Sequence, residues 1–266
     1  MLTVDFIGAG NVATRMATGL HRSGVKVRHI ASRSTESART LAGATKATAV
    51  PIDSIGRGAS MVIVAVNDDA IRTILDMAQP QDNDTVWVHT SGSVGMDVFD
   101  PVKFPRHGVF YPLQTMSRGL DIDWSRVPLF TEGSSAETES MITDTARLLT
   151  PRVTHLSSDK RRQLHAAAVI GCNMAVYLWS LSETVMREAG LDFEMMRPLL
   201  EVTLERTRSL PPTEAMTGPA RRGDLHTIEG HMRSLPPQIA GVYGFLSWEI
   251  LKIYHPELTD RIYEQN

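Results

Sequence analysis

The fold of the N-terminal half is decided by the stretch LTVDFIGAGNVA, residues 2–13. Residues 2–7 form a short apolar-rich run that ends at Gly8. The following segment carries apolar residues at helical spacing until Ser23-Gly24 stops it. The pattern therefore predicts a strand, a glycine turn and a helix in direct succession.

The turn carries a G-x-G-x-x-A motif, in which each small residue has a distinct use. Gly8 permits the tight turn, Gly10 lets the backbone approach a pyrophosphate, and Ala13 lets the helix pack closely on the strand. The first amides of the helix, at Asn11 and Val12, would face the phosphates. Small residues also occur in turns that bind nothing. The strand before the motif and the helix after it nevertheless indicate a dinucleotide-binding domain of the Rossmann type.

Further strand patterns follow at residues 25–31, 61–66, 85–89, 108–110 and 127–130, with helical stretches between several of them. The run at 61–66 is uninterruptedly apolar, which is typical of a central parallel strand covered on both faces. From Ser158 onward only helical patterns occur, at about 159–188, 193–209, 219–233 and 239–254. We expect an α/β domain with a doubly wound parallel sheet at 1–157 and an all-helical domain for substrate binding and dimerisation at 158–266.

The residues after the second strand select the nucleotide. NAD sites usually carry Asp or Glu there to bind the ribose 2′-OH, whereas this chain has Ser32, Arg33 and Ser34. Arg33 offers a planar charged fork to a 2′-phosphate, and the two serines offer hydroxyl donors. The sequence therefore predicts NADP(H) as the cofactor. The alternative is that Arg33 is a solvated residue at the start of a helix.

Two later strand ends carry small and polar residues where ligands of open parallel sheets bind. Val66 and Asn67 end one strand, and Thr90 and Ser91 end the next. We expect these four residues to contact the ribose and nicotinamide. The neighbouring Asp68 and Asp69 are better explained as helix caps.

Composition excludes several classes of protein. A hydrophobic content of 42% and a charged content of 21% are ordinary for globular proteins, and the net charge of −3 gives no electrostatic case for nucleic acid. Residues 166–181 are apolar but too short and too interrupted for a membrane span, so they predict a buried helix and no membrane association. The single cysteine, Cys172, fits a reducing compartment, and the strand pattern near Met1 leaves no room for a signal peptide. We therefore expect a cytoplasmic protein. The sequence contains no recognisable metal-binding motif.

These residues resemble a known superfamily. Residues 8–13, 32–34 and 65–68 look like the N-terminal domain of pyrroline-5-carboxylate reductases and deazaflavin-dependent NADP reductases. Residues 89–93, 111–115, 165–173 and 217–231 are similar to a bacterial family of Rossmann-type NADP oxidoreductases whose C-terminal domain has no assigned function. That family belongs to the superfamily of 6-phosphogluconate dehydrogenase and pyrroline-5-carboxylate reductase.

The resemblance implies the reaction class and leaves the substrate open. In better-known relatives a long helix opening the second domain carries a Lys and an Asn that meet the substrate, and the second domains pair into dimers. The resemblance therefore implies a homodimer formed through the C-terminal helices. This chain has Asn173, but Val169 stands one turn before it and His165 a further turn back.

Hydride transfer needs a proton donor near the developing negative charge, and histidine suits this near neutral pH. We expect one catalytic cleft that contains His165 as the proton donor. Its other expected members are Ser91, Tyr111, Asn173, Asp224 and His231. The alternatives are that His165 is a packed helix residue and that Asp224 and His231 lie on a solvated helix face. Cys172 is expected to be a small core residue, and Lys160-Arg161-Arg162 a solvated turn of helix.

The leading hypothesis is an NADP(H)-dependent oxidoreductase that transfers a hydride between NADPH and a small carbonyl, imine or hydroxy-acid compound. One alternative is a non-catalytic NADPH sensor. Another is a reductase whose redox partner is a deazaflavin. An enzyme would turn over NADPH, a sensor would only bind it, and a deazaflavin would change its absorption spectrum.

Overall fold

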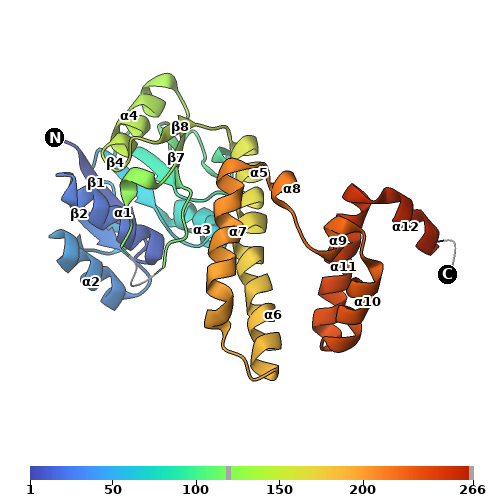
Figure 1. Ribbon diagram of the computed structural model, residues 1–266. Helices are drawn as coiled ribbons and strands as arrows, with labels where there is room; N and C mark the ends of the chain where they lie inside the picture. The colour runs from blue at the N-terminus through green and yellow to red at the C-terminus, as the bar shows by residue number, and fades with distance from the viewer. Residues whose placement is uncertain (118–120, 264–266) are drawn as a thin grey trace. The chain divides into compact units, whose positions relative to one another are not determined.

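The computed structural model describes residues 1–117 and 121–263, and the chain divides into two compact units, Met1–Val169 and Ile170–Asn266. In the described part of the first unit the strands form one eight-stranded sheet, in the order β3-β2-β1-β4-β5-β6-β7-β8 (Figure 1). All neighbouring strands are parallel except β6 and β7. The strands are β1 (Thr3–Ile7), β2 (Lys26–Ala31), β3 (Thr48–Ala49), β4 (Met61–Val64), β5 (Val86–His89), β6 (His107–Pro112), β7 (Leu129–Gly133) and β8 (Val153–His155). The predicted α/β class and mostly parallel sheet are confirmed.

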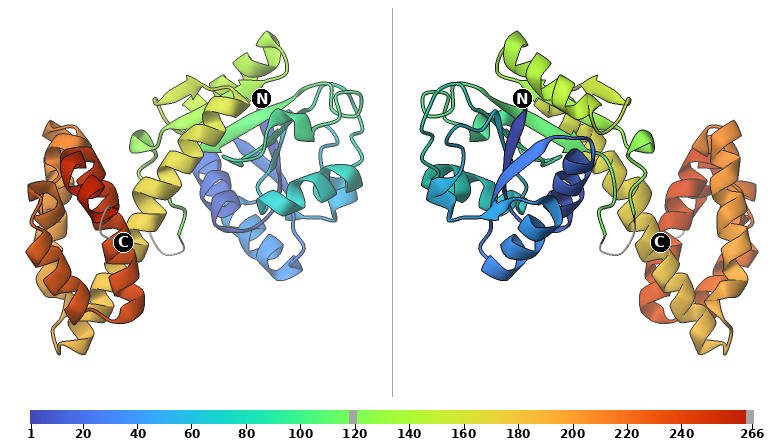
Figure 2. Two further views of the ribbon diagram at one scale, coloured as in Figure 1. Left: turned by 90° about the vertical axis from the view of Figure 1, so that its right-hand side faces the viewer. Right: turned by 90° about the vertical axis from the view of Figure 1, so that its left-hand side faces the viewer.

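Helices cover both faces of this sheet, as Figure 2 shows from two sides. One face packs against α1 (Asn11–Arg22), α2 (Thr35–Thr45) and α4 (Ala136–Arg147), through a core that includes Phe6, Met16 and Phe110. The other face packs against α3 (Asp68–Met77) and the short helix η2 (Met96–Val98). The short helices η1 (Ile52–Ser54) and η3 (Trp124–Arg126) lie in connections. Burial on both faces explains why the central strand β4 is uniformly apolar.

Helix α5 (Ser158–Ala168) belongs to the first unit. The boundary predicted from the sequence precedes this helix, whereas the compact unit includes it. The cause is Arg161, which is completely buried and pairs with Glu132 of β7. The expectation that residues 160–162 form a solvated turn is therefore wrong for Arg161, because a carboxylate in the sheet compensates its charge.

The secondary structure of the second unit, in its described residues, consists of helices, as the pattern from Ser158 onward predicts. Two of the predicted helices are interrupted. The predicted helix at 159–188 changes from α5 into a π-helical segment, η4 (Val169–Met174), and continues as α6 (Ala175–Glu188). The predicted helix at 219–233 is broken by Gly223, whose φ of 73° is left-handed. The remaining helices are η5 (Phe193–Met196), α7 (Arg197–Ser209), α8 (Pro212–Ala215), α9 (Pro219–Arg222), α10 (Leu225–Ser234), α11 (Pro237–Tyr254) and α12 (Pro256–Tyr263).

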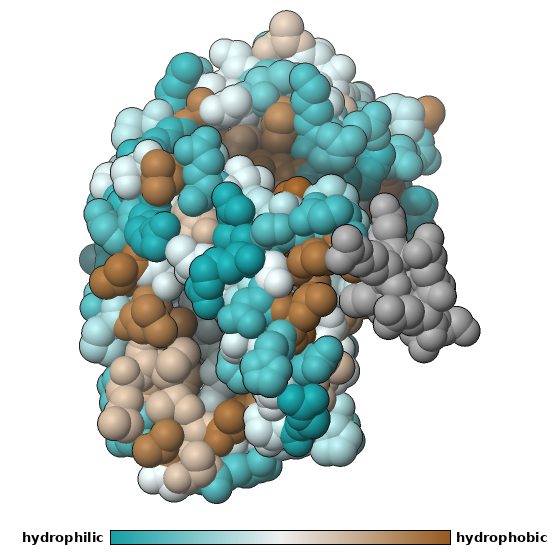
Figure 3. Space-filling model, turned by 45° about the vertical axis from the view of Figure 1, so that its right-hand side comes forward, coloured by the Kyte–Doolittle hydropathy of each residue, from teal (hydrophilic) through white to brown (hydrophobic). Residues whose placement is uncertain are grey.

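The apolar side chains of α6 are at the surface, contrary to the expected buried helix. Tyr177 is 56% exposed and Trp179 is 44% exposed, and Cys172, expected in the core, is also exposed. Figure 3 shows hydrophobic side chains, in brown, among hydrophilic ones on one face of the molecule. By length and composition the continuous helix Ser158–Glu188 could cross a membrane, and its most apolar window is not buried within the chain. The expectation failed because an apolar helix needs a cover, and this chain alone does not supply one.

Candidate active site

The glycine turn after β1 has the geometry that its motif predicts. Gly8 has a φ of 115°, and a Cβ added there would lie 2.1 Å from the carbonyl oxygen of Ala65. A Cβ on Gly10, by contrast, would meet nothing within 4 Å, so the space beside that backbone is open. Ala13 is fully buried against the sheet. The loop is thus closed on its inner side and accessible where a pyrophosphate would approach the first amides of α1.

A second segment of the first unit lies against the start of α1. The amide nitrogen of the Asn11 side chain donates to the carbonyl of Met116 at 2.9 Å, and Arg15 donates to the carbonyl of Ser117 at 3.0 Å. Asn11 therefore uses one side-chain N–H to hold this segment, while its backbone amide faces the open side of the turn. Val12, the other residue predicted at this turn, is partly buried.

The residues after β2 divide into one cap and one free cation. Ser34 is the N-cap of α2 and accepts a hydrogen bond from the backbone of Ser37 at 3.2 Å. Ser32 is partly buried, and Arg33 is exposed with no hydrogen bond or ion pair to the described residues. The Arg33 guanidinium is therefore available to an anion at the N-terminus of α2, where the helix dipole also favours negative charge.

The polar residues after β4 lie beside those after β5. Asn67 is exposed at the N-cap position of α3 and makes no side-chain cap, whereas Asp68 accepts a short hydrogen bond from the hydroxyl of Ser93. Asp68 therefore ties two strand ends together, and the expectation that it caps a helix is wrong. Val66, predicted to contact the cofactor, is partly buried at the same strand end.

The loop after β5 is shaped by Ser91. Its Oγ accepts hydrogen bonds from the backbone amides of Ser93 and Val94, at 3.1 and 3.0 Å, and Ser91 is only 6% exposed. The preceding Thr90 is also buried, and its amide bonds to the carbonyl of Val64 at 3.3 Å. Ser91 therefore shapes the loop. Its own hydroxyl hydrogen points to the hydroxyl of Ser93 at 3.3 Å, because Ser93 donates to Asp68.

The buried side chain of His89 binds two backbone groups of this loop. Its Nδ1 accepts from the amide of Ser91 at 3.2 Å, and its Nε2 lies 3.4 Å from the carbonyl of Gly95, which assigns the proton to Nε2. Burial, followed by the positive charge of Arg161, lowers the pKa of His89 to about 4. The imidazole is thus neutral near pH 7 and acts as a support for the loop.

Tyr111 and His165 form a pair next to that loop. The Tyr111 hydroxyl lies 3.1 Å from Nδ1 of His165, and the two rings meet edge to face with centroids 6.0 Å apart. Tyr111 is the penultimate residue of β6 and is buried, while His165 lies on α5 and is partly exposed. Burial raises the pKa of Tyr111 and outweighs the opposing charge of Arg161, so the phenol stays protonated at neutral pH. The sequence placed both residues in one site without predicting their contact.

Gly92 makes this contact possible. A Cβ on Gly92 would lie 2.6 Å from Nδ1 of His165 and 2.7 Å from Cζ of Tyr111. Any side chain at this position would therefore force at least one ring to move. Sequence reasoning missed the role of Gly92, although a glycine between two serines directly after a strand was a usable signal.

Three other predicted site residues belong to the second unit. Asn173 is exposed in the π-helical segment, where the 100° per residue assumed for an α-helix does not hold. Asp224 caps α10 and accepts from the amide and hydroxyl of Thr227 at 3.1 and 2.7 Å, and these bonds lower its pKa. Both carboxylate oxygens therefore serve the cap, and a catalytic role for Asp224 stays a prediction. Because Gly223 ends the predicted helix at 219–233 early, Arg221 lies on α9, whereas Asp224 caps α10 and His231 lies on it.

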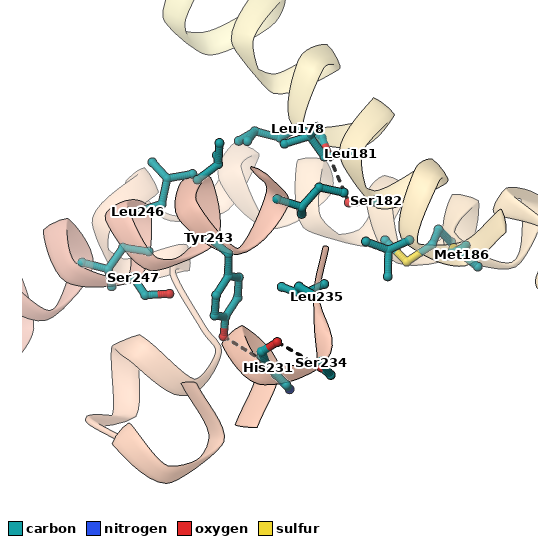
Figure 4. Close-up of a pocket in the computed structure, with 15 residues that line it drawn as sticks. Leu178, Leu181, Ser182, Met186, His231, Ser234, Leu235, Tyr243, Leu246 and Ser247 are labelled. Carbon is teal, nitrogen blue, oxygen red and sulfur yellow. Dashed lines mark hydrogen bonds between the residues drawn. The ribbon is translucent and has the colours of Figure 1, made fainter. Parts of the chain in front are cut away.

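His231 borders an apolar groove of about 570 Å³ within the second unit. Its Nδ1 lies 2.8 Å from the hydroxyl of Tyr243, and Figure 4 shows the two side chains facing each other. The rest of the lining is largely aliphatic and includes Leu178 and Leu181 of α6 and Leu246 of α11. The common cleft predicted for Asn173 and His231 with the residues of the first unit stays a prediction.

Comparisons with known proteins agree with this organisation. Residues 3–91 match the family model "NADP oxidoreductase coenzyme F420-dependent", and residues 127–250 match "Domain of unknown function (DUF2520)". No curated protein matches the sequence. A Bacteroides fragilis protein, whose structure is described as a "putative NADP oxidoreductase", is 34% identical, with 94% of this chain and 97% of that chain covered and a TM-score of 0.85.

Two more distant structures share the fold. A Thermotoga maritima protein is 23% identical, with a TM-score of 0.71 over 99% of this chain and 100% of its own. An imine reductase from Myxococcus stipitatus, solved with NADP⁺, is 14% identical, with a TM-score of 0.65 over 95% of both chains. The chain accordingly belongs to the family of NADP oxidoreductases that join a Rossmann-type nucleotide-binding domain to this C-terminal domain, and it is an NADP-dependent oxidoreductase.

Proposed function

We propose that the protein reduces the carbonyl or imine group of a small molecule and that the Tyr111–His165 pair supplies the proton. The observation that carries this proposal is the 3.1 Å contact between these side chains at the carboxyl end of β6. Ligands of open parallel sheets bind at that edge. A protonated phenol beside an imidazole is a suitable proton source there.

The residues of the glycine turn fit the NADP that the reaction requires. The open backbone at Gly10 and the amides of Asn11 and Val12 would hold the pyrophosphate, and the free guanidinium of Arg33 would hold the 2′-phosphate. When bound, NADPH supplies the hydride. The reverse reaction, oxidation of an alcohol or amine, uses the same groups in the opposite sense.

The proton follows a path of two side chains. The Tyr111 O–H bond breaks as its proton passes to the carbonyl oxygen or imine nitrogen, and the phenolate takes the Nδ1 proton of a His165 imidazolium. The neutral imidazole that remains is partly exposed and regains a proton from water. The pair therefore returns to its starting state, because His165 restores the proton of the buried Tyr111 phenolate at once.

The test begins with a panel of cyclic imines, ketones and ketone–amine mixtures, followed by loss of NADPH absorbance. For a compound that is reduced, His165→Ala and Tyr111→Phe should each lower turnover by about 10²- to 10⁴-fold while the Kd for NADPH is unchanged. His226→Ala, at an exposed position of α10, is the matched control. Unchanged turnover in both site variants would refute the proposal.

A second candidate function is hydride exchange between NADP and a deazaflavin. The matched family model over residues 3–91 favours it, since that model describes a coenzyme F420-dependent oxidoreductase. Incubation with oxidised coenzyme F420 and NADPH distinguishes the two candidates. Bleaching of the deazaflavin absorbance would support this second function. Unchanged absorbance would exclude it and favour the reduction of a small carbonyl or imine compound.

We also propose that the working form is a cytoplasmic homodimer whose interface is formed by the C-terminal helices. Exposed side chains on α6, such as Tyr177, on α7, such as Leu199, and on α11, such as Phe245, exceed what monomers usually show together. A second copy would cover these side chains and enter the groove beside Tyr243. We favour a second copy over a membrane because the first turn of the same continuous helix carries the buried Arg161, which is paired with Glu132 of the sheet.

A further inference from the structure

A buried ion pair joins three segments around the Tyr111–His165 pair. Arg161 of α5 donates from one terminal nitrogen to Glu132 of β7 at 2.6 Å, and from the other to the carbonyl of Val94 at 2.6 Å. Ser158, the first residue of α5, donates to Glu132 from both its amide and its hydroxyl, at 2.9 and 2.7 Å. The helix, the sheet and the loop after β5 therefore meet at one guanidinium.

Burying the charges of Arg161 and Glu132 costs free energy of folding. Arg161 has no exposed surface, and its Nε has no hydrogen-bond partner among the described residues. Buried ion pairs often contribute no more to stability than an apolar pair of similar volume, because both charges must leave water. Burial alone would raise the pKa of Glu132, but the hydrogen bonds from Ser158 and Arg161 outweigh it and leave the pKa lowered, so the carboxylate stays charged. Stability alone does not account for this pair.

The pair lies where it fixes the geometry of the reaction. Arg161 and His165 are four residues apart on α5, so they share a helix face one turn apart. The second terminal nitrogen of Arg161 binds the carbonyl of Val94, in the loop that also carries Gly92. Gly92 packs directly against the rings of Tyr111 and His165. A small shift of α5 or of the loop would therefore separate Tyr111 from His165.

We propose that the Glu132–Arg161 pair is a positioning device that sets α5 and the loop after β5 so that His165 meets Tyr111. This inference rests on the proposed function, because it assigns a purpose to that contact. Arginine is required since a single ammonium cannot bond Glu132 and Val94 in the same fork geometry. The pair touches neither substrate nor cofactor in this role.

The test measures the contact directly and needs no substrate. In the intact protein with NADP⁺ bound, nuclear Overhauser effects between the His165 imidazole and the Tyr111 ring report their contact, with His165→Gln used to assign the imidazole signals. Arg161→Lys should remove these effects, whereas Arg162→Lys should retain them. Arg162 is the matched control, because it is the exposed neighbour on the same helix and pairs with Asp159 at the surface.

A second variant covers the case in which Arg161→Lys fails to fold. The double change Glu132→Leu with Arg161→Met removes both charges and leaves apolar side chains of similar size, which buried sites often tolerate. It should fold and still lose the contact. If the double variant or Arg161→Lys keeps the Overhauser effects of the unaltered protein, the positioning role is refuted.

Turnover separates this inference from the proposed function. If both hold, Arg161→Lys lowers kcat by about 100-fold with KM and the Kd for NADPH unchanged, since misplacement by about 1 Å can cost that much. If the contact is lost in Arg161→Lys while His165→Ala has normal turnover, the positioning role stands and the proposed function fails. If His165→Ala is slow and Arg161→Lys keeps the contact, the positioning inference fails alone.

Discussion

The two units differ in how they treat their apolar side chains. In the first unit Phe6, Trp87 and Phe110 are at most 1% exposed, and both sheet faces are covered. In the second unit Tyr177 and Phe245 are 56% and 64% exposed, and the described core is a small cluster around Ile228 and Leu251. The first unit thus buries its large apolar side chains within itself, whereas the second leaves many of its own exposed.

The polar residues show the opposite contrast. The first unit buries Glu132, His89 and Arg161 in a connected network around its site. In the second unit Asp224 serves a local helix cap. Burying a charged group costs free energy unless the group is paired, and such a pairing fixes its position. A large exposed apolar surface usually marks a site that a partner covers. The difference supports the two proposals that the proton chemistry belongs to the first unit and assembly to the second.

The largest effect should come from breaking the assembly. Replacing Tyr177 and Phe245 together by Glu should weaken dimer association by about 10³-fold or more, since two central aromatic anchors each contribute about 2 kcal/mol or more. Light scattering after size exclusion measures the mass. The control is Met77→Glu, because Met77 is 54% exposed on the first unit and lies outside the proposed interface. A monomeric unaltered protein at micromolar concentration would contradict the dimer.

The next effect concerns the buried imidazole of the first unit. Because the pKa of His89 is about 4 when folded and about 6.5 when unfolded, the unfolded chain binds more protons between these pH values. The neutral His89 imidazole therefore makes its full contribution to the free energy of unfolding above about pH 6.5. As the pH falls toward 4, the free energy of unfolding decreases by about 3 kcal/mol.

His89→Asn should flatten this fall, since an Asn keeps an acceptor near Nδ1 and does not titrate. Urea unfolding followed by tryptophan fluorescence measures the free energy of unfolding at each pH. The difference between the two proteins at about pH 8, where both side chains are neutral, gives the packing cost alone. An equal fall in both proteins would show that His89 is not the group that titrates.

A smaller effect is expected at the nucleotide. Arg33→Ala should weaken NADPH binding by roughly 10- to 150-fold and leave NADH nearly unchanged, because one charged hydrogen bond is worth about 1.5 to 3 kcal/mol. Titration of NADPH fluorescence gives both constants, and Arg39→Ala, an exposed arginine further along α2, is the control. Equal affinity of the unaltered protein for the two cofactors would contradict the role of Arg33.

The sequence predicted local structure well where the pattern was short. The glycine turn, the apolar strand β4 and the start of a helix at Pro219 all depend on nearby residues, and the structure confirms them. We also predicted that Ser91, Tyr111 and His165 line one cleft, because strand ends of a parallel sheet share an edge. The structure places all three in the first unit, although the predicted boundary put His165 in the second domain.

Two of the failures depend on contacts that the local sequence pattern does not contain. The burial of Arg161 is set by Glu132, and the exposure of Cys172 results from a missing cover. The short strands β3 and β8 were missed because they carry few residues. The break at Gly223 was missed because a glycine within a helical pattern is often tolerated.

The central claim is that the Tyr111–His165 pair delivers the proton beside the nicotinamide. A crystal structure of the intact protein with NADP⁺ tests it most directly, through the distance from nicotinamide C4 to the Tyr111 hydroxyl. The account predicts that the hydroxyl and C4 contact the same small cavity, about 6 Å apart or less, with Tyr111 still bonded to His165. A separation of more than about 8 Å, with both side chains turned away from the nicotinamide, would contradict it.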